Sequence, residues 1–436
     1  MRLLPAAVLL ALAAPAASAQ TLTDQIDPLA DKVEAKVIQH RRHVHQNPEL
    51  GNREFETAKY IAKHLRNIGI EVRTGVAKTG VIGILRGGKP GPVIAMRADM
   101  DALPVTEETT LSFRSKVKTT YDGKQVGVMH ACGHDGHVAM QLGAAEVIAR
   151  LKGQWPGTVK FIFQPAEEGA PVGEEGGAQL MIKENVLKKD PKPEVIFGQH
   201  IVTWFGAAGE LGYRAGGLMA SADDLEIVVE GKGAHGASPW KGVDPIVVAS
   251  QIVLALQTIA SRQMDATKAP VIVTIGKIEG GTRNNIIPDT VTMKGTLRAL
   301  DRDMRQQLQD RVKRIAEDIA HSAGATAKVA FSQHTAYPVT FNDPALTARM
   351  LPTLKRVAGD KALEVQPVLG AEDFSFFAQE IPGLYLFLAG RPVSAPAEGY
   401  PSNHSARFDY DESVLKLGVR NLAHLAADYA QGASPP

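Results

Sequence analysis

The sequence predicts an α/β protein in which a large domain, with a mixed central sheet flanked by helices, is interrupted by an inserted ferredoxin-like α+β domain. The chain has 436 residues, which is more than one ordinary domain needs. Short apolar runs alternate with helical patterns in its first half, and a strand-helix-strand-strand-helix-strand order follows. Residues typical of a binding site recur after that module, which indicates an insertion. We therefore assign residues 20–217 and 332–436 to the large domain and 218–331 to the inserted one.

The large domain begins with a helical pattern from Ile26 to Gly69, which Asn47-Pro48 interrupts because proline cannot continue a helix. Three apolar runs predict buried strands: Val93–Met96, Val159–Phe163 and Val195–Phe197. A group of polar, chemically active residues follows each run. Ligands collect at the carboxyl ends of strands in α/β sheets, so we expect these three groups to converge on one site.

The inserted domain opens with the alternating pattern Asp224–Glu230, which is typical of a half-buried strand. A glycine-rich turn then leads into a long apolar helix that ends at Ile259, and a later amphipathic pattern predicts a second helix. The elements after the first helix are the strand Val271–Ile278, the strand Val291–Leu297 and the helix Asp301–His321.

After Phe331 the chain returns to the large domain. The polar motif Gly370–Phe374 precedes an apolar strand at Leu384–Leu388, and a last helix ends near Ala430. Between them, His404 lies in a loop rich in glycine, proline and serine, where a lone histidine would ordinarily face solvent.

The first residues predict export. Arg2 is followed by the apolar run Leu3–Ala17 and by Ala17-Ser18-Ala19, a small-residue cleavage pattern, so residues 1–19 read as a signal peptide. The run is too short to span a membrane. We expect a mature chain that starts at Gln20 and is periplasmic or secreted.

Composition excludes several classes of partner. The chain is 44% hydrophobic and 22% charged, as globular proteins are, and its formal net charge is +1. That balance provides no electrostatic footprint for nucleic acid or for an anionic membrane surface. No later segment is both long and charge-free enough for a membrane span, so we expect a small-molecule partner.

The run His130–His137, with sequence His-Ala-Cys-Gly-His-Asp-Gly-His, indicates a metal site. It contains Cys132, the only cysteine in a chain with 13 histidines. A thiolate beside imidazoles suits a borderline-soft ion such as zinc. A buried structural cysteine is the alternative interpretation, because free cysteine is usually buried. Four candidate ligands within eight positions favour the metal.

Several motifs in the chain resemble one metallopeptidase family, that of the co-catalytic zinc aminoacylases, glutamate carboxypeptidases and acetylornithine deacetylases. The likeness is greatest to its branch of hippurate hydrolases, N-acyl-amino-acid amidohydrolases and plant auxin-conjugate hydrolases. It rests on these segments: Arg41–Leu50, Arg97–Pro104, His130–His137, Phe163–Gly169, Gly231–Pro239, Asn285–Asp289, Gly370–Phe374 and His404. It implies a zinc-peptidase-like catalytic domain and an inserted domain that serves as a lid or in dimerisation.

The resemblance also implies a set of metal ligands and a base. Glu167 is the implied general base and acid. The implied ligands are Cys132, His134, Glu168, His200 and His404. Five ligands exceed what one tetrahedral zinc takes, so we expect two divalent ions, zinc or manganese, that share a bridging ligand. Cys132 is our candidate for that bridge.

Four further residues take roles from the same resemblance. His235 matches a histidine of the small domain that reaches across a dimer and stabilises the tetrahedral oxyanion, a contribution of about 3–4 kcal/mol. Asn285 and Arg298 are candidates for binding the substrate's free carboxylate. Arg97 stands where many family members carry a ligating histidine and cannot ligate, so Asp99 would only orient a neighbour. A homodimer or higher homo-oligomer follows from this expectation.

The predicted function is hydrolysis of the amide bond of N-acyl amino acids, hippurate-like or similar, by a metal-activated water with Glu167 as base. An exported metallo-dipeptidase or carboxypeptidase of the same fold is the near alternative, because both substrate types place an amide beside a carboxylate. A non-catalytic metal- or ligand-binding homologue is a second alternative. The presence of Glu167 and of every proposed ligand argues against it.

Overall fold

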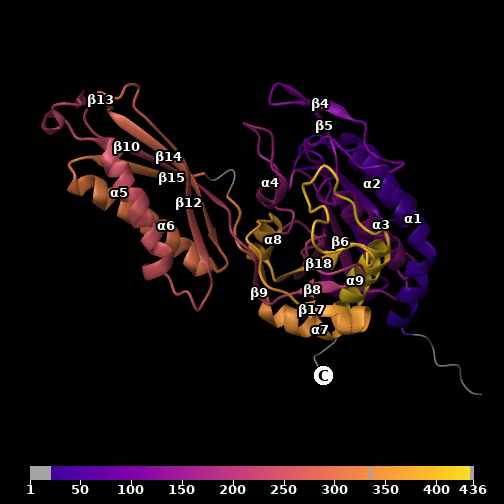
Figure 1. Ribbon diagram of the computed structural model, residues 1–436. Coiled ribbons are helices and arrows are strands. Elements are labelled where there is room, and N and C mark those ends of the chain that lie inside the picture. The colour runs from indigo at the N-terminus through magenta and orange to yellow at the C-terminus, as the bar shows by residue number, and fades with distance from the viewer. Residues whose placement is uncertain (1–20, 333–335, 433–436) are drawn as a thin grey trace, which may run out of the picture.

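The computed structural model describes residues 21–332 and 336–432, which form two bodies with separate sheets (Figure 1). The larger body contains both ends of the described chain, and the smaller body is built from its middle. The predicted signal peptide, residues 1–19, and the expected first mature residue Gln20 lie outside the described residues.

The larger body is organised around an eight-stranded mixed sheet in the order β1-β2-β6-β3-β7-β18-β8-β17. The four central strands β6, β3, β7 and β18 are parallel, and the next strand on each side, β2 and β8, runs antiparallel to them. The strands are β1 Glu71–Val76, β2 Gly80–Arg86, β3 Lys89–Asp99, β6 Pro156–Gln164, β7 Val195–Val202, β8 Leu211–Tyr213, β17 Ala362–Glu364 and β18 Gly383–Ala389. The predicted mixed sheet is confirmed.

The three predicted central strands are neighbours in this sheet, and their carboxyl ends lie side by side. Asp99 on β3 pairs with Gln164 on β6, and His200 on β7 pairs with Phe387 on β18. The strands are longer than their apolar runs predicted. Arg97, Asp99 and His200 lie within strands rather than after them, because main-chain pairing continues beyond the last apolar residue.

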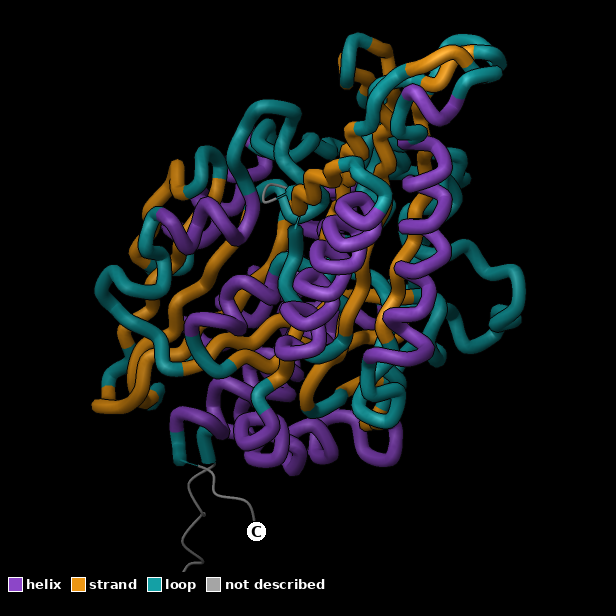
Figure 2. Tube along the Cα trace, turned by 90° about the vertical axis from the view of Figure 1, so that its left-hand side faces the viewer, coloured by secondary structure: helices purple, strands orange, loops and turns teal. Residues whose placement is uncertain are grey.

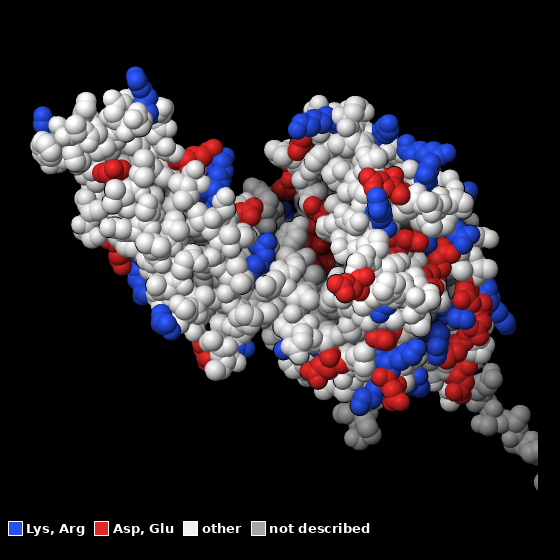
Figure 3. Space-filling view, in the orientation of Figure 1, with Lys and Arg blue, Asp and Glu red and all other residues white. Residues whose placement is uncertain are grey.

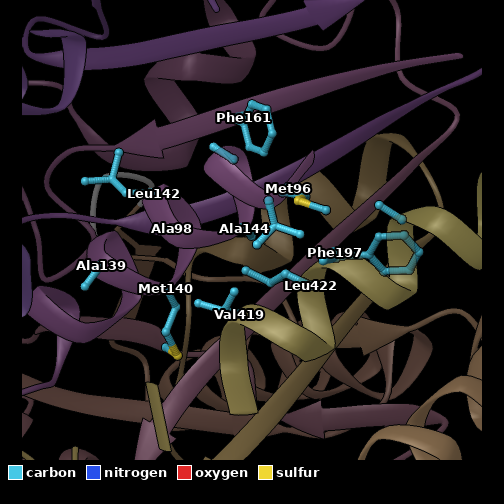
Figure 4. Close-up of a cluster of buried hydrophobic side chains, with 14 of the residues drawn as sticks. Met96, Ala98, Ala139, Met140, Leu142, Ala144, Phe161, Phe197, Val419 and Leu422 are labelled. Atoms are coloured by element: carbon cyan, nitrogen blue, oxygen red, sulfur yellow. The ribbon is translucent and has the colours of Figure 1, made fainter. Parts of the chain in front are cut away.

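Helices cover both faces of the large sheet, because successive side chains of a strand point to opposite faces. Met96, Phe161 and Phe197 lie in one cluster with side chains of α3 and α9 (Figure 4), and α1, α2 and α7 contribute to the same cluster. The alternate residues of the strands pack with α4 and α8 on the other face. The helices are α1 Ile26–Gln46, α2 Phe55–Asn67, α3 His134–Arg150, α4 Gly177–Lys183, α7 Pro344–Ala358, α8 Phe374–Glu380 and α9 Ser413–Ala430. The expected break at Asn47-Pro48 separates α1 from α2.

Helix α3 is an element that the periodicity did not predict. It begins at His134, directly after Gly133, whose φ of 97° lies in the left-handed region that favours glycine. It is buried on nearly every side from His134 to Ile148, so its sequence has no polar face to reveal it. The metal-ligand motif therefore turns directly into the central helix of the larger body.

The smaller body is a four-stranded antiparallel sheet, β12-β14-β10-β15, with two helices. Its elements follow the predicted strand-helix-strand-strand-helix-strand order, and Figure 2, turned so that this body faces the viewer, shows its two helices side by side. The elements are β10 Asp223–Glu230, α5 Pro245–Thr258, β12 Val271–Gly280, β14 Thr290–Ala299, α6 Arg302–Ser322 and β15 Thr326–Phe331. The predicted ferredoxin-like α+β module is confirmed.

Each helix of the smaller body starts at an aspartate cap. The side chain of Asp244 accepts the backbone N–H of Ile246 before α5, and Asp301 accepts that of Met304 before α6, both at 2.9 Å. Such a cap satisfies a backbone donor that has no partner inside the helix.

The stretch Pro245–Gln263, which includes α5 and a π-helical turn at Ile259–Gln263, is long and apolar enough to cross a membrane by length and composition. No such segment was expected from the sequence. Val248, Ile252 and Leu256 on this stretch are buried against the sheet, so part of its apolar character serves packing inside the smaller body.

Short strands complete the structure. The strands β9 and β16 pair with each other where the chain leaves and re-enters the larger body, and β4 and β5 form a hairpin near the site. The short strands are β4 Lys118–Tyr121, β5 Lys124–Gly127, β9 Gly216–Met219, β11 Ala234–His235, β13 Ile286–Ile287 and β16 Thr340–Asn342.

Candidate metal centre

All five residues implied as ligands come together at the carboxyl end of the large sheet. They form two groups in which one ligand atom of each residue lies within 4.8 Å of the others. The first group is Cys132, His134 and His200, and the second is Cys132, Glu168 and His404. Cys132 belongs to both, which is the position that a bridging ligand would occupy.

The thiol of Cys132 is at the middle of this arrangement. Its Sγ lies 3.4 Å from Nε2 of His200 and 3.2 Å from Nε2 of His404. The Nε2 atom of His404 is also 3.0 Å from Oε1 of Glu168. Sulfur, imidazole nitrogen and carboxylate oxygen are the donor types that zinc binds. This donor set therefore fits a divalent metal.

His134 and His200, the two buried histidines, both present Nε2 to the site. Nδ1 of His134 donates to the carbonyl oxygen of Asp101 at 2.8 Å, and Nδ1 of His200 donates to that of Ile201 at 2.7 Å. In the neutral imidazole each Nε2 then carries a lone pair, the tautomer that metal-binding histidines adopt. Within the described chain Nε2 of His134 is buried without a hydrogen-bond partner, which a cation would relieve.

The crowding of buried acidic groups at the site also favours a bound cation. Burial and then the neighbouring carboxylates of Glu168 and Glu167 raise the pKa of Cys132. Burial followed by Glu372 and Glu168 raises the pKa of Glu167. So many buried acidic groups cannot all ionise without compensating positive charge.

His404 contacts the site because its loop is anchored. The side-chain amide of Asn403 donates to the carbonyl oxygens of Cys132 and Ile201, both at 3.0 Å. The backbone N–H of His404 donates to the carbonyl of Ala131 at 2.7 Å. A loop histidine would ordinarily face solvent, and the side chain is still 55% exposed, but these bonds hold it beside Cys132.

Asp99, which was expected to orient a neighbour, contacts His137. Its Oδ1 accepts a hydrogen bond from Nδ1 of His137 at 2.6 Å, and Nε2 of His137 accepts the backbone N–H of Ile201 at 2.8 Å. Both nitrogens of His137 are thus occupied. His130 belongs to none of the candidate ligand groups among the described residues, and burial lowers its pKa to about 3.

Arg97 is a site residue whose contacts the sequence reasoning missed. Its buried guanidinium donates to Asp99 at 2.6 Å, to Glu372 at 2.8 Å and to Asp373 at 2.7 Å. It also donates to Gln164 at 2.8 Å. The only sequence signal was an arginine at a buried strand end together with a distant Glu-Asp pair in the motif Gly370–Phe374.

Glu167 lies between this charge network and the ligands. One carboxylate oxygen from each of Glu167, Glu372 and Asp373 lies within 4.8 Å of the other two. Oε1 of Glu167 also accepts the backbone N–H of Asp373 at 3.4 Å. Its backbone carbonyl accepts the hydroxyl of Tyr337 at 2.7 Å. Tyr337 was not predicted as a site residue, because a single tyrosine in a connecting segment has no distinctive pattern.

Four of the five candidate ligands, all except His134, line a cavity of about 470 Å³ together with Glu167. The apolar residues that line it are Val202, Trp204, Met219, Val368 and Phe387. A neighbouring cavity of about 640 Å³ shares Glu168, Tyr337 and Ala371 with the first and reaches Arg298 on β14 of the smaller body. Figure 3 shows acidic side chains inside the hollow between the two bodies.

Two predicted residues are not near the cluster in this chain. His235 on β11 is exposed, and its Nδ1 accepts the N–H of Ala237 at 3.0 Å. Asn285 is also exposed, beside β13 at the end of the smaller body far from the large sheet (Figure 1). Arg298 lines the shared hollow, and its Nη1 donates to Thr296 at 2.6 Å.

Comparison with known proteins identifies the family. The model of the peptidase family M20/M25/M40 matches residues 95–428. The chain belongs to this family. The matched range contains all five candidate ligands and the whole smaller body, so the resemblance drawn from the motifs is confirmed.

Relatives in the M20 family cover nearly the full chain. Thermostable carboxypeptidase 2 of Saccharolobus solfataricus is 43% identical over 94% of this chain and 99% of its own. IAA-amino acid hydrolase ILR1-like 2 of Arabidopsis thaliana is 41% identical over 90% of this chain and 85% of its own. The crystal structure of Bacillus subtilis YXEP protein, described as a dinuclear metal binding peptidase from the M20 family, matches at 33% identity with a TM-score of 0.76, covering 92% of this chain and 98% of its own.

The family and the geometry establish the class of protein. This M20 protein is a metal-dependent hydrolase that acts on amide bonds, and its Cys132-centred donor set suits a divalent metal ion.

Proposed function

We propose that this enzyme hydrolyses the amide bond of N-acyl amino acids, hippurate-like or similar conjugates. The observation that carries the proposal is that Glu167 lines a largely apolar cavity together with candidate ligands. An apolar cavity suits an acyl group. The name of the related IAA-amino acid hydrolase, a hydrolase of an amino-acid conjugate, supports the same choice of substrate.

The five donors would hold two divalent ions, zinc or manganese. One ion would bind at Cys132, His134 and His200, and the other at Cys132, Glu168 and His404. The B. subtilis protein, described as binding a dinuclear metal, supports the count of two. When bound, the ions supply Lewis acidity that polarises an amide carbonyl and makes a water molecule more acidic.

Glu167 would transfer the proton. Its carboxylate lies among the ligand groups yet is not needed as a ligand, since adjacent Glu168 fills that place in the second group. It would accept the proton of the attacking water and then donate it to the departing amine, the paired tasks of a general base and a general acid.

Each of the two cavities would bind a different part of the substrate. The acyl group would lie against Trp204, whose ring contacts Phe387 with centroids 5.2 Å apart. The free carboxylate would lie in the second cavity, where Arg298 is placed to form a paired contact. Asn285 remains a candidate for the same carboxylate only if a second copy of the chain brings it close.

A homodimer is part of the proposal. The smaller body exposes many large apolar side chains, as interaction surfaces do. These side chains are Trp240, Ile246, Val247, Leu254, Ile272, Ile278 and Ile286. A partner subunit bound there would bring its own His235 toward the cluster, where that imidazole would stabilise the tetrahedral oxyanion. Sedimentation analysis tests the dimer, and a monomeric active enzyme would exclude this role for His235.

Export is proposed on the leader pattern alone. The run before Ala17-Ser18-Ala19 has the composition of a signal peptide, so the mature enzyme would start at Gln20 in the periplasm or outside the cell. Amino-terminal sequencing of the enzyme from cell fractions tests this. An enzyme that starts at Met1 in the cytoplasmic fraction would contradict it.

A carboxypeptidase or dipeptidase is the second candidate function, because thermostable carboxypeptidase 2 is 43% identical to this chain. Free-amine release from N-acetyl-, N-benzoyl- and aminoacyl-amino acids separates the two candidates. We expect the N-acyl substrates to be preferred and the activity to be lost with a chelator and restored by zinc or manganese. Preference for aminoacyl substrates would favour the peptidase, and no release with any metal would favour a non-catalytic homologue.

A further inference from the structure

We propose that Tyr337 is a positioning residue that links the junction between the two bodies to Glu167. Its phenol hydroxyl donates a hydrogen bond of 2.7 Å to the backbone carbonyl oxygen of Glu167. The inference rests on the proposed function, because that function assigns the proton transfer to Glu167. The contact itself is independent of that assignment.

Tyr337 belongs to the junction by its backbone. The chain leaves the larger body through β9 and returns through β16, and these two strands pair antiparallel. Beyond them, the backbone N–H of Ala222 donates to the carbonyl of Tyr337 at 2.9 Å, and the N–H of Tyr337 donates to that of Ala222 at 2.8 Å. Because β10 starts at Asp223, Tyr337 lies where the smaller body begins.

The turn that carries Glu167 needs external support. Ala166 has a φ of 51°, in the left-handed region that residues other than glycine rarely adopt. Side chains from elsewhere hold three backbone groups of this turn. Glu54 accepts the N–H of Ala166 at 2.8 Å, and Asp101 accepts the N–H of Glu168 at 3.0 Å. The hydroxyl of Tyr337 is the third and the one that comes from the junction.

The returning segment also supports the loop that faces the Glu167 carboxylate. The hydroxyl of Thr340 donates to the carbonyl of Glu372 at 3.1 Å. The Tyr337 ring makes an edge contact with Phe376, with centroids 6.3 Å apart. The segment thus holds Glu167 through its backbone and through the loop beside its carboxylate. A change in the angle between the two bodies would shift Glu167 relative to the metal ligands.

Tyr337 acts through its hydrogen bond and not as an acid. Burial, followed by the charge of Glu167, raises the pKa of its phenol well above the ordinary range, so the hydroxyl remains a neutral donor at working pH. Its single proton is directed at a backbone carbonyl. Removal of the hydroxyl should therefore affect the position of Glu167 while leaving the metal donors intact.

The test is Tyr337→Phe, which keeps the ring against Phe376 and removes only the hydroxyl. We expect kcat to fall by about 10- to 100-fold, the range for a misplaced catalytic group, while KM and metal content stay within about twofold. Hydrogen exchange measured by mass spectrometry on the peptide 164–170 should become faster, in both metal-free and metal-loaded protein.

Tyr60→Phe is the matched control, because the Tyr60 hydroxyl also makes a 2.7 Å bond, to Nδ1 of His40 between α1 and α2. It should change neither kcat nor exchange in the peptide 164–170. Unchanged kcat and exchange in Tyr337→Phe would overturn the inference, as would a loss of kcat that follows loss of metal. If the wild-type protein cleaves no amide but the Tyr337→Phe variant still shows faster exchange, the result would support the bond between Tyr337 and the Glu167 turn. It would then contradict only the proposed function.

Discussion

The guanidinium of Arg97 donates a hydrogen bond of 2.8 Å to the carboxylate of Glu372, although 275 residues separate them in the chain. The same guanidinium also forms ion pairs with Asp99 and with Asp373, whose backbone N–H contacts Glu167. One buried cation thus joins the strand that orients His137 to the loop that faces Glu167. The bond between Arg97 and Glu372 therefore connects the two stretches of chain that form the larger body, one before and one after the smaller body in sequence.

We predict that Arg97→Met strongly destabilises the protein, because it leaves several buried carboxylates without their cation. The free energy of unfolding should fall by about 3–5 kcal/mol, as when one partner of a buried ion pair is removed. Urea denaturation measures this. Arg42→Met is the control, since Arg42 pairs with Glu412 at 2.6 Å with half of its own side chain exposed. That change should cost at most about 1 kcal/mol, and equal losses in both variants would refute the prediction.

Cys132→Ser should weaken metal binding, because a hydroxyl is a poorer ligand for a borderline-soft ion than a thiolate. We expect the apparent affinity to fall by more than the roughly 10- to 100-fold that a lost outer-shell partner costs. Chelator competition followed by elemental analysis measures the change. His130→Gln alters the same run outside the ligand groups and should retain its metal. Full metal content in the serine variant would remove Cys132 from the ligand set.

Acid should destabilise the protein through His40 and His64, which contact each other with ring centroids 4.5 Å apart. Burial lowers the pKa of His40 to about 3 and that of His64 to about 4. The unfolded chain binds protons near pH 6.5 while the folded chain does not, so stability is lost as pH falls from about 6.5 toward 4. Each histidine contributes a slope of up to about 1.4 kcal/mol per pH unit.

Urea denaturation at several pH values between 4 and 7.5 tests this, with His64→Leu as the comparison. That variant should lose part of the pH slope, because one of the two proton-binding groups of the unfolded chain is gone. A slope identical to the wild type would show that other groups control the acid sensitivity.

The sequence predicted the arrangement of the fold well because its signals are local. The apolar runs of β3, β6 and β7 and the alternation of β10 follow directly from which faces are buried. Helix α3 has no such signal, since it is buried on nearly every side and starts inside the metal-ligand motif. The ends of β3 and β7 were predicted too early, because hydrogen-bond pairing with a neighbouring strand is not a property of either strand alone.

The candidate site was predictable where chemistry is concentrated in the chain, as at Cys132 and His134. His404 could be assigned only through the family resemblance, because the bonds that Asn403 makes to Cys132 and Ile201 join distant segments. Tyr337 and Glu372 were missed as contacts of Glu167 for the same reason. Their roles depend on tertiary packing, which no spacing within the sequence records.

Trp204→Ala should change which substrates are preferred rather than abolish turnover. The indole lines the cavity beside the ligands and packs edge-on against Phe387, so its loss widens the cavity and removes apolar surface from its wall. We expect kcat/KM for N-benzoyl substrates to fall by about 10-fold or more, as one lost apolar contact costs 1–3 kcal/mol. The value for N-acetyl substrates should change little, because a methyl group does not reach that wall.

Glu167→Gln should retain metal and fold but lose nearly all turnover. The amide has nearly the same shape as the carboxylate, so the bond from the Tyr337 hydroxyl to the backbone carbonyl and the bond from the Asp373 N–H to the side-chain oxygen can both persist, but the amide cannot accept a proton from water. General-base removal predicts a fall in kcat of about 100- to 10,000-fold. Glu175→Gln, which changes an exposed acid paired with Lys183 at 2.7 Å, should leave kcat unchanged. A Glu167→Gln enzyme with wild-type kcat would rule out proton transfer by this residue, and the base would then have to be sought among the other buried carboxylates, Glu372 and Asp373.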